Sequence, residues 1–136
     1  MVTPQLKENG LIASVKTLVN DLKATNTMNV FFYHQDEIEV LSSGKKVTLF
    51  RIVQEQVKNT IKHSKAKNLT IHLDSIDDNV QLIIEDDGVG FDTKQIRKGI
   101  GLSNIYDRTR FYNGKLQIKA SPGQGCKMIV EIPFLG

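Results

Sequence analysis

The chain has 136 residues, a formal net charge of +3 and a hydrophobic fraction of 40%. These values favour a single globular domain and argue against disorder. Its single cysteine excludes an internal disulfide and a cysteine-rich zinc module. The sequence shows no apolar run long enough to span a membrane, no signal peptide, and too small a basic excess to indicate a nucleic-acid partner. We therefore expect a cytoplasmic domain with no direct membrane contact.

The first half of the chain is expected to alternate between helices and strands. Apolar residues at helical spacing predict a helix over about residues 8–25, and β-branched and aromatic residues predict a strand over 28–34. Residues 36–41 fit a second short strand or a loop. Two serines and a glycine at 42–44 precede a longer helix over about 46–64. The apolar face of this helix is expected to contain Leu49, Phe50, Val53, Val57 and Ile61.

The second half is expected to contain two hairpins separated by a loop and a helix. Alternating residues on either side of a turn at 77–79 predict the first hairpin over 69–87. Polar, glycine-containing residues at 88–101 predict a loop, and residues 102–112 predict a helix. The second hairpin is expected over 115–134.

The order of these elements predicts the fold class. Pro122 and Gly123 suit the two central positions of a type II turn in the last hairpin. Because hairpins outnumber strand–helix–strand crossovers, we expect an α+β protein, a two-layer α/β sandwich. Its mostly antiparallel mixed sheet would have about five strands, with three helices on one face.

Four polar side chains on the long helix form the first candidate site. Glu55, Asn59, Lys62 and His63 are spaced i, i+4, i+7 and i+8, which places them on one face, away from the apolar stripe. A carboxylate and an amide one turn apart supply oxygen ligands of the kind that Mg²⁺ prefers. A solvated helix face would explain the same pattern, so the spacing alone leaves both interpretations open.

The second candidate site follows a strand, at Asp86-Asp87-Gly88-Val89-Gly90. A carboxylate at a buried strand end is costly unless it is paired. Asp86 could accept a hydrogen bond from an exocyclic amine such as N6 of adenine, and it would discriminate against guanine, which presents an acceptor there. The two glycines permit close approach of a ligand. An ordinary Asp-Gly turn is the simpler alternative.

Two further glycine pairs lie in predicted loops. Gly99 and Gly101 precede the helix over 102–112, and backbone N–H groups at such a position can bind an anion. A flexible loop that ends in a helix is the alternative. Gly123 and Gly125 are explained fully by a tight β-turn.

The order of these segments is more specific than any one of them. It runs Glu55-x-x-x-Asn59, Asp86-x-Gly88-x-Gly90, Gly99-x-Gly101-Leu102 and Gly123-x-Gly125. This order resembles the ATP-binding domain of sensor histidine kinases, within the gyrase, heat-shock chaperone, histidine kinase and MutL superfamily. Residues 51–66, 85–92 and 99–118 are similar to the subfamily of nitrate and lipid-fluidity sensors, and 6–22 is similar to its lead-in from the dimerisation helices. The resemblance implies a Bergerat ATP-binding fold over residues 1–136, a domain excised from a longer protein.

The resemblance also implies roles for the residues near the two ends of the nucleotide. Asp86 would accept the adenine amino group, and Gly88 and Gly90 would form the pocket floor. Asn59 would ligate the Mg²⁺ that bridges the phosphates of ATP. Glu55 would be catalytic, either as a base or by ordering the metal and its water.

Basic groups are expected around the phosphates. Lys62 and His63 would lie beside them, so His63 is not expected to be the phosphoacceptor. Residues 91–98 would form a short ATP lid that includes Lys98, hinged at the glycines that follow it. The complete expected ATP-binding set is Asn59, Lys62, His63, Asp86, Gly88, Gly90, Lys98, Gly99, Gly101, Leu102, Gly125 and Cys126.

Two features depart from the pattern that the resemblance implies. Cys126 stands where the family often has threonine, and a thiol is a weaker hydrogen-bond donor than a hydroxyl. The acceptor histidine of the family lies in an upstream helix, whereas His34 and His72 fall in predicted strands and are expected at the surface. Partners are therefore expected to be the dimerisation and phosphoacceptor helices of the same kinase, and the receiver domain of a response regulator.

The leading interpretation is the catalytic domain of a bacterial sensor histidine kinase, with ATP and Mg²⁺ as cofactors. In the full protein it would donate the γ-phosphoryl group to a histidine, and alone it would show little turnover. Two alternatives are a stand-alone serine kinase of the anti-sigma type and a non-catalytic nucleotide-binding module.

Overall fold

The computed structural model describes residues 4–90 and 102–135, with side chains described from residue 10 onward. Its elements lie along the chain in the order α1 (Pro4–Ala24), β1 (Asn29–His34), the 3-10 helix η1 (Asp36–Val40), α2 (Ser43–His63), β2 (Asn68–Ile76), β3 (Asn79–Asp86), α3 (Leu102–Phe111), β4 (Lys115–Ala120) and β5 (Cys126–Pro133).

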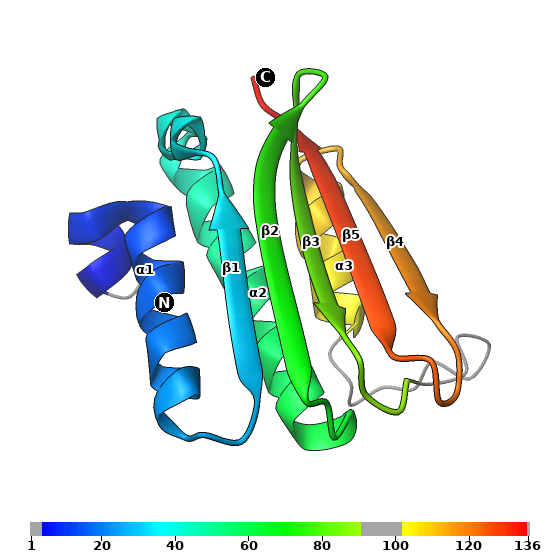
Figure 1. The fold of residues 1–136 in the computed structure, drawn as a ribbon. Coiled ribbons are helices and arrows are strands. Elements are labelled where there is room, and N and C mark those ends of the chain that lie inside the picture. Colours follow the sequence, from blue (N-terminus) through cyan, green and yellow to red (C-terminus); the bar gives the residue numbers. More distant parts are fainter. Residues whose placement is uncertain (1–3, 91–101, 136) are drawn as a thin grey trace.

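The five strands form one mixed sheet in the order β1-β2-β3-β5-β4. Only β1 and β2 pair in parallel, and the other neighbours are antiparallel. Helices α2 and α3 lie behind the sheet in Figure 1, and α1 packs against β1 and α2 at one edge. The predicted α+β sandwich with a mostly antiparallel sheet is confirmed.

Strand alternation builds the core between the sheet and the helices. Every second residue of the central strands faces the helix layer and is buried, and the residues between them are more exposed. A register slip of one residue would exchange the two faces. The buried row comprises Leu69, Ile71 and Leu73 of β2, Val80, Leu82 and Ile84 of β3, and Met128, Val130 and Ile132 of β5. Each such side chain contributes about 1.5–3 kcal/mol when fully buried.

Both predicted hairpin turns are confirmed. Asp77 and Asp78 have φ values of 48° and 65°, which fits a two-residue turn between β2 and β3 with both central residues left-handed. In the second turn Gly123 has φ 77°, and Gln124 N donates to Ser121 O at 3.0 Å. That geometry is a type II turn.

Residues 36–41 form neither the expected strand nor a loop, because η1 occupies most of this segment. Its geometry inserts Ile38 fully into the core and brings Glu39 to helix α1, which is interrupted at Gly10 (φ 87°, ψ −178°). There Ile12 N donates to Glu39 Oε1 at 2.6 Å, and Lys46 Nζ lies 3.5 Å from the other carboxylate oxygen. A carboxylate is stabilising at the start of a helical segment, so η1 serves to cap α1.

Two other expectations need correction. Helix α2 begins at Ser43 rather than near residue 46, because the Ser42 side chain accepts a hydrogen bond from Lys45 N and caps the helix. His34 lies on the same side of β1 as buried Val30, with its ring 5.0 Å from that of Phe32 and its side chain only 19% exposed. His72 is on the open face of the sheet, stacked on Tyr33 at 5.0 Å.

Candidate functional site

The C-terminal end of α2 meets the end of β3, and this junction brings the first two candidate segments together. Val89 N donates to the carbonyl oxygen of Ser64, the C-cap residue of α2, at 2.7 Å. The Thr60 hydroxyl donates to Asp86 Oδ2 at 3.4 Å. Glu55 and Asn59 are half-buried on α2, whereas Lys62 and His63 are exposed.

Asp86 is a buried carboxylate, with 6% of its surface exposed. Its Oδ1 accepts a hydrogen bond from Gly88 N at 2.8 Å. Burial raises the pKa of Asp86, and the hydrogen bonds from Gly88 and Thr60 offset this only in part. Such an acceptor, held rigidly in a dry environment, can recognise a ligand donor.

Asp87 has the opposite environment, although it is the next residue. It is exposed, and its carboxylate accepts from Lys67 N, Asn68 N and Asn68 Nδ2 at 2.7–2.9 Å. These hydrogen bonds, led by those from Asn68, lower the pKa of Asp87. Asp87 therefore anchors the loop between α2 and β2, which leaves Asp86 as the ligand-binding candidate.

The glycines beside Asp86 are packed against backbone. A Cβ at Gly88 would collide with the carbonyl oxygen of Ser64 and its side chain. Gly90 and Gly125 have φ values of 63° and 74°, and a Cβ on either would meet backbone carbonyls. Only glycine fits these positions, so the strand end is held as a close-packed floor.

Cys126 lies opposite Asp86 in the register of β3 and β5. It is 4% exposed, and burial, followed by the charge of Asp86, raises the pKa of the thiol to about 11. The thiol is therefore neutral near pH 7. Its sulfur accepts from Gln56 Nε2 at 3.9 Å.

Sequence reasoning missed three buried polar residues that support this site. Gln56 and Thr60 of α2, and Ser64 at its C-cap, are each less than 10% exposed and are spaced i, i+4 and i+8. That periodicity places them in one row that faces Asp86 and Cys126. The signal was present in the sequence, but it is visible only when polar residues are counted as candidates for the buried stripe.

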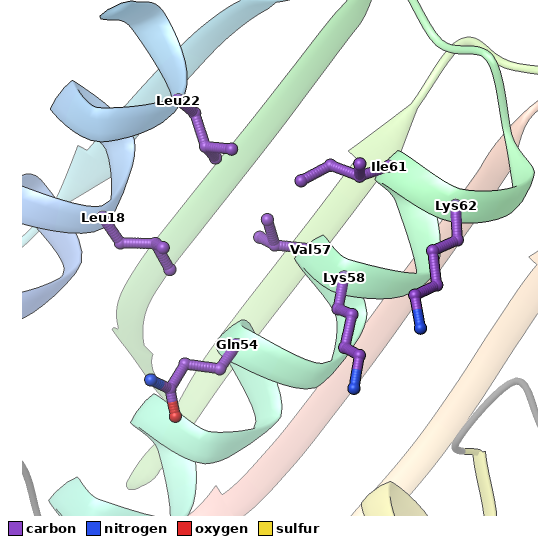
Figure 2. Close-up of a pocket in the computed structure, with 7 residues that line it drawn as sticks. All are labelled: Leu18, Leu22, Gln54, Val57, Lys58, Ile61 and Lys62. Carbon is purple, nitrogen blue, oxygen red and sulfur yellow. The ribbon is translucent and has the colours of Figure 1, made fainter. Parts of the chain in front are cut away.

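A groove of about 290 Å³ lies on the other side of α2, against α1. Figure 2 shows Leu18 and Leu22 of α1 facing Val57 and Ile61 of α2, with Lys62 at the rim. Ile61 was expected in the buried stripe but is 56% exposed, because it lines this groove. Lys62 extends outward beside the groove, and its predicted phosphate role remains a prediction.

Several predicted site residues lie outside the described part of the chain. These are Lys98, Gly99 and Gly101, together with the expected lid over 91–98. Leu102 is described, and it is buried as the first residue of α3.

The donor set at the end of α2 fits Mg²⁺ better than a transition metal. Within residues 10–90 and 102–135, no three His, Cys, Asp or Glu side chains gather at one point. Asn59 and Glu55 offer one amide and one carboxylate oxygen, and Mg²⁺ commonly takes one or two protein oxygens alongside phosphate oxygens and water.

Among the described helices none is long and apolar enough to cross a membrane.

Comparison with known proteins identifies the class. Residues 44–136 match the family of histidine kinase-, DNA gyrase B- and HSP90-like ATPases. The match covers more than half of the chain, so the chain belongs to this ATPase family, as the order of its motifs predicted.

The named relatives point to one branch of this family. An uncharacterized sensor-like histidine kinase of Chloroflexus aurantiacus is 31% identical over 95% of the chain, which spans 23% of that protein. The signal transduction histidine-protein kinase/phosphatase DegS of Brevibacillus brevis is also 31% identical over 95% of the chain, which spans 34% of it. The blue-light activated histidine kinase of Erythrobacter litoralis EL346 shares the fold, with a TM-score of 0.74 and 14% identity over 91% of the chain and 42% of its own. The chain thus corresponds to the catalytic domain of sensor histidine kinases and spans about a third or less of these two curated relatives.

Proposed function

We propose that this chain binds ATP with Mg²⁺ and, within a longer protein, donates the γ-phosphoryl group to a histidine on a separate dimerisation helix. The phosphoryl group would then pass to the receiver domain of a response regulator. Membership of the ATPase family and similarity to named sensor histidine kinases support this proposal.

The observation that carries the proposal is the junction of α2 with the end of β3. A buried acceptor, Asp86, lies at one end of the junction, and the oxygen-bearing Asn59 lies one residue from Thr60, which contacts Asp86. A nucleotide has a hydrogen-bond donor at its base and anionic oxygens at its phosphates. The site offers an acceptor for the base and an amide oxygen for a phosphate-bound cation, so its groups are of the kinds that both parts of such a ligand need.

The residues would divide the work as follows. Asp86 would accept the adenine amino group, over the floor formed by the neighbouring glycines. Asn59 and Glu55 would hold Mg²⁺, which when bound supplies positive charge to the phosphates. Phosphoryl transfer depends mainly on positioning and charge stabilisation, so the main task of the chain would be to hold ATP in one orientation.

Nucleotide binding is tested by calorimetry with ATP and GTP, with Mg²⁺ and in EDTA. We expect ATP to bind more tightly than GTP, since Asp86 faces a donor on adenine and an acceptor on guanine. Asn59→Ala should remove the part of the affinity that depends on Mg²⁺. Glu85→Gln, which removes a charge from an exposed residue on the open face of β3, is the control variant. It should change none of these affinities. Equal affinities for ATP and GTP would refute the adenine assignment.

Histidine phosphorylation is tested with the longer protein that includes the dimerisation helices. Radiolabelled γ-phosphate should enter the protein, be lost in acid, survive in alkali, and pass to a receiver domain. An acid-stable phosphoester would instead support the serine-kinase alternative. Binding of ATP with no transfer to any protein would support the non-catalytic alternative.

A further inference from the structure

Gln56 is a buried polar residue at the centre of the site, and none of the expected roles uses it. It is 4% exposed and lies three residues before Asn59 on α2. Its Nε2 donates to Cys126 Sγ at 3.9 Å, and its Oε1 accepts from Asn59 Nδ2 at 3.3 Å. Gln56 therefore connects the strand that carries Cys126 to the expected metal ligand.

The direction of these hydrogen bonds decides which end of Asn59 is available. A side-chain amide has a donor end and an acceptor end, and only the oxygen can ligate a cation. With Nδ2 engaged by Gln56, Asn59 Oδ1 accepts no hydrogen bond from the described residues. Its oxygen is therefore available to a cation.

The reverse arrangement would have the opposite effect. If the Gln56 and Asn59 amides were both rotated by half a turn, Gln56 Nε2 would donate to Asn59 Oδ1 and compete with the cation. Rotation of Gln56 alone would place two donors face to face. The observed orientation uses both ends of the Gln56 amide, because Nε2 donates to Cys126 Sγ while Oε1 accepts from Asn59 Nδ2.

We propose that Gln56 is a positioning residue that holds Asn59 with Oδ1 toward Mg²⁺ and the phosphates. This inference rests on the proposed function, because it presupposes that Asn59 ligates the metal. It extends that function by assigning the orientation of the Asn59 side chain to a hydrogen-bond relay from Cys126 of β5 through Gln56 of α2.

The test measures how much Mg²⁺ strengthens ATP binding to this chain. Gln56→Met keeps the length and apolar volume of the side chain but removes both hydrogen bonds. We expect the ratio of affinities with Mg²⁺ and in EDTA to fall roughly fivefold, the size of one modest hydrogen bond, with the EDTA affinity changed less than about twofold. Gln54→Met is the matched control on the same helix, where Gln54 is exposed, and it should change neither value.

A second measurement does not require nucleotide. In the nucleotide-free chain, the side-chain amide resonances of Asn59 should shift upfield in Gln56→Met and stay unchanged in Gln54→Met. Cys126→Ala leaves Gln56 in place but removes its acceptor, so it should lower the Mg²⁺ ratio in the same direction by a smaller factor. This variant tests the relay even if Gln56→Met does not fold.

The outcomes separate the inference from the proposed function. If the wild-type chain shows no ATP binding or no effect of Mg²⁺, the proposed function fails. If the wild type shows the effect and both variants keep it, with unchanged Asn59 resonances, the relay is wrong. Equal losses of affinity with Mg²⁺ and in EDTA would also overturn it, because they would show a structural role alone.

Discussion

Replacing Asp86 by Asn should strongly weaken ATP binding while leaving the folded chain as stable as before, or more stable. Burial raises the pKa of Asp86, which means that the folded state holds the ionised carboxylate less favourably than the unfolded state does. Its ionisation therefore lowers stability once the pH exceeds the unfolded pKa. Asparagine keeps an acceptor for Gly88 N and places an amide against the Thr60 hydroxyl, which can also accept. The substitution removes the charge and replaces one acceptor oxygen by a donor nitrogen.

The two effects differ in size as well as in sign. A hydrogen bond to a charged group contributes about 1.5–3 kcal/mol, so its loss should weaken ATP binding by about ten- to 150-fold. If the asparagine presented its amide nitrogen to the adenine amino group, two donors would face each other and binding would weaken further. For stability we expect a gain on the order of 1 kcal/mol or less, a common size for one stabilising substitution. In a chain of 136 residues that corresponds to a rise in Tm of up to about 3–5 °C.

Thermal unfolding with and without Mg²⁺-ATP measures both effects in one series. Asp87→Asn is the control, since hydrogen bonds from Asn68 and Lys67 lower the pKa of Asp87 and its charge is stabilising. We expect Asp86→Asn to keep or raise the nucleotide-free Tm and to lose the shift caused by ATP. Asp87→Asn should lower the nucleotide-free Tm. A lower Tm in Asp86→Asn, or an ATP shift as large as that of wild type, would refute the reasoning.

Three further predictions follow from the same contacts. Gly88→Ala should destabilise the chain by about 1–3 kcal/mol in urea unfolding, because the added Cβ meets Ser64. Gly123→Ala has open space around the added Cβ but a φ of 77°, so it should cost about 1 kcal/mol. Equal costs for the two variants would contradict this. Lys45→Met should cost about 1–3 kcal/mol, since buried Lys45 Nζ donates to the carbonyls of residues 133 and 134 at 2.7 and 3.3 Å; an unchanged midpoint would contradict this. The stability difference between wild type and Asp87→Asn should shrink as the pH falls below 3.8 through the lowered pKa of Asp87, and a constant difference would assign the effect to something other than charge.

Most of the fold could be predicted because its core follows simple periodicity. Alternation over 69–87 and 115–134 fixed both which faces are buried and where the hairpins turn. Helical spacing identified α1 and α2, although the Ser42 cap moved the start of α2 forward. Local patterns of this kind depend on residues close in sequence, and a single chain displays them directly.

Contacts between distant residues could not be predicted in the same way. The 3-10 geometry of η1 depends on Ile38, which is buried in the core, and on Glu39, which contacts α1. Glu39 lies 27 residues away in sequence from its partner Ile12. The burial of Gln56 and Thr60 does not follow from the pattern of α2 alone, because that pattern places polar residues on the solvent-facing side. Burial of a polar group is favourable only with a partner, and its partners lie on β3 and β5.

The position of the site is a consequence of the register of the sheet. Asp86 is the last inward-facing residue of β3, in the same row as Leu82 and Ile84, and Cys126 is the first inward-facing residue of β5. The chemistry of the site thus begins where the apolar row ends, at the same edge of both strands. A shift of one residue would turn Asp87 inward and Asp86 outward, exchanging a carboxylate with raised pKa for one that anchors a loop. The same interactions that specify the core therefore specify which of two adjacent aspartates faces the ligand.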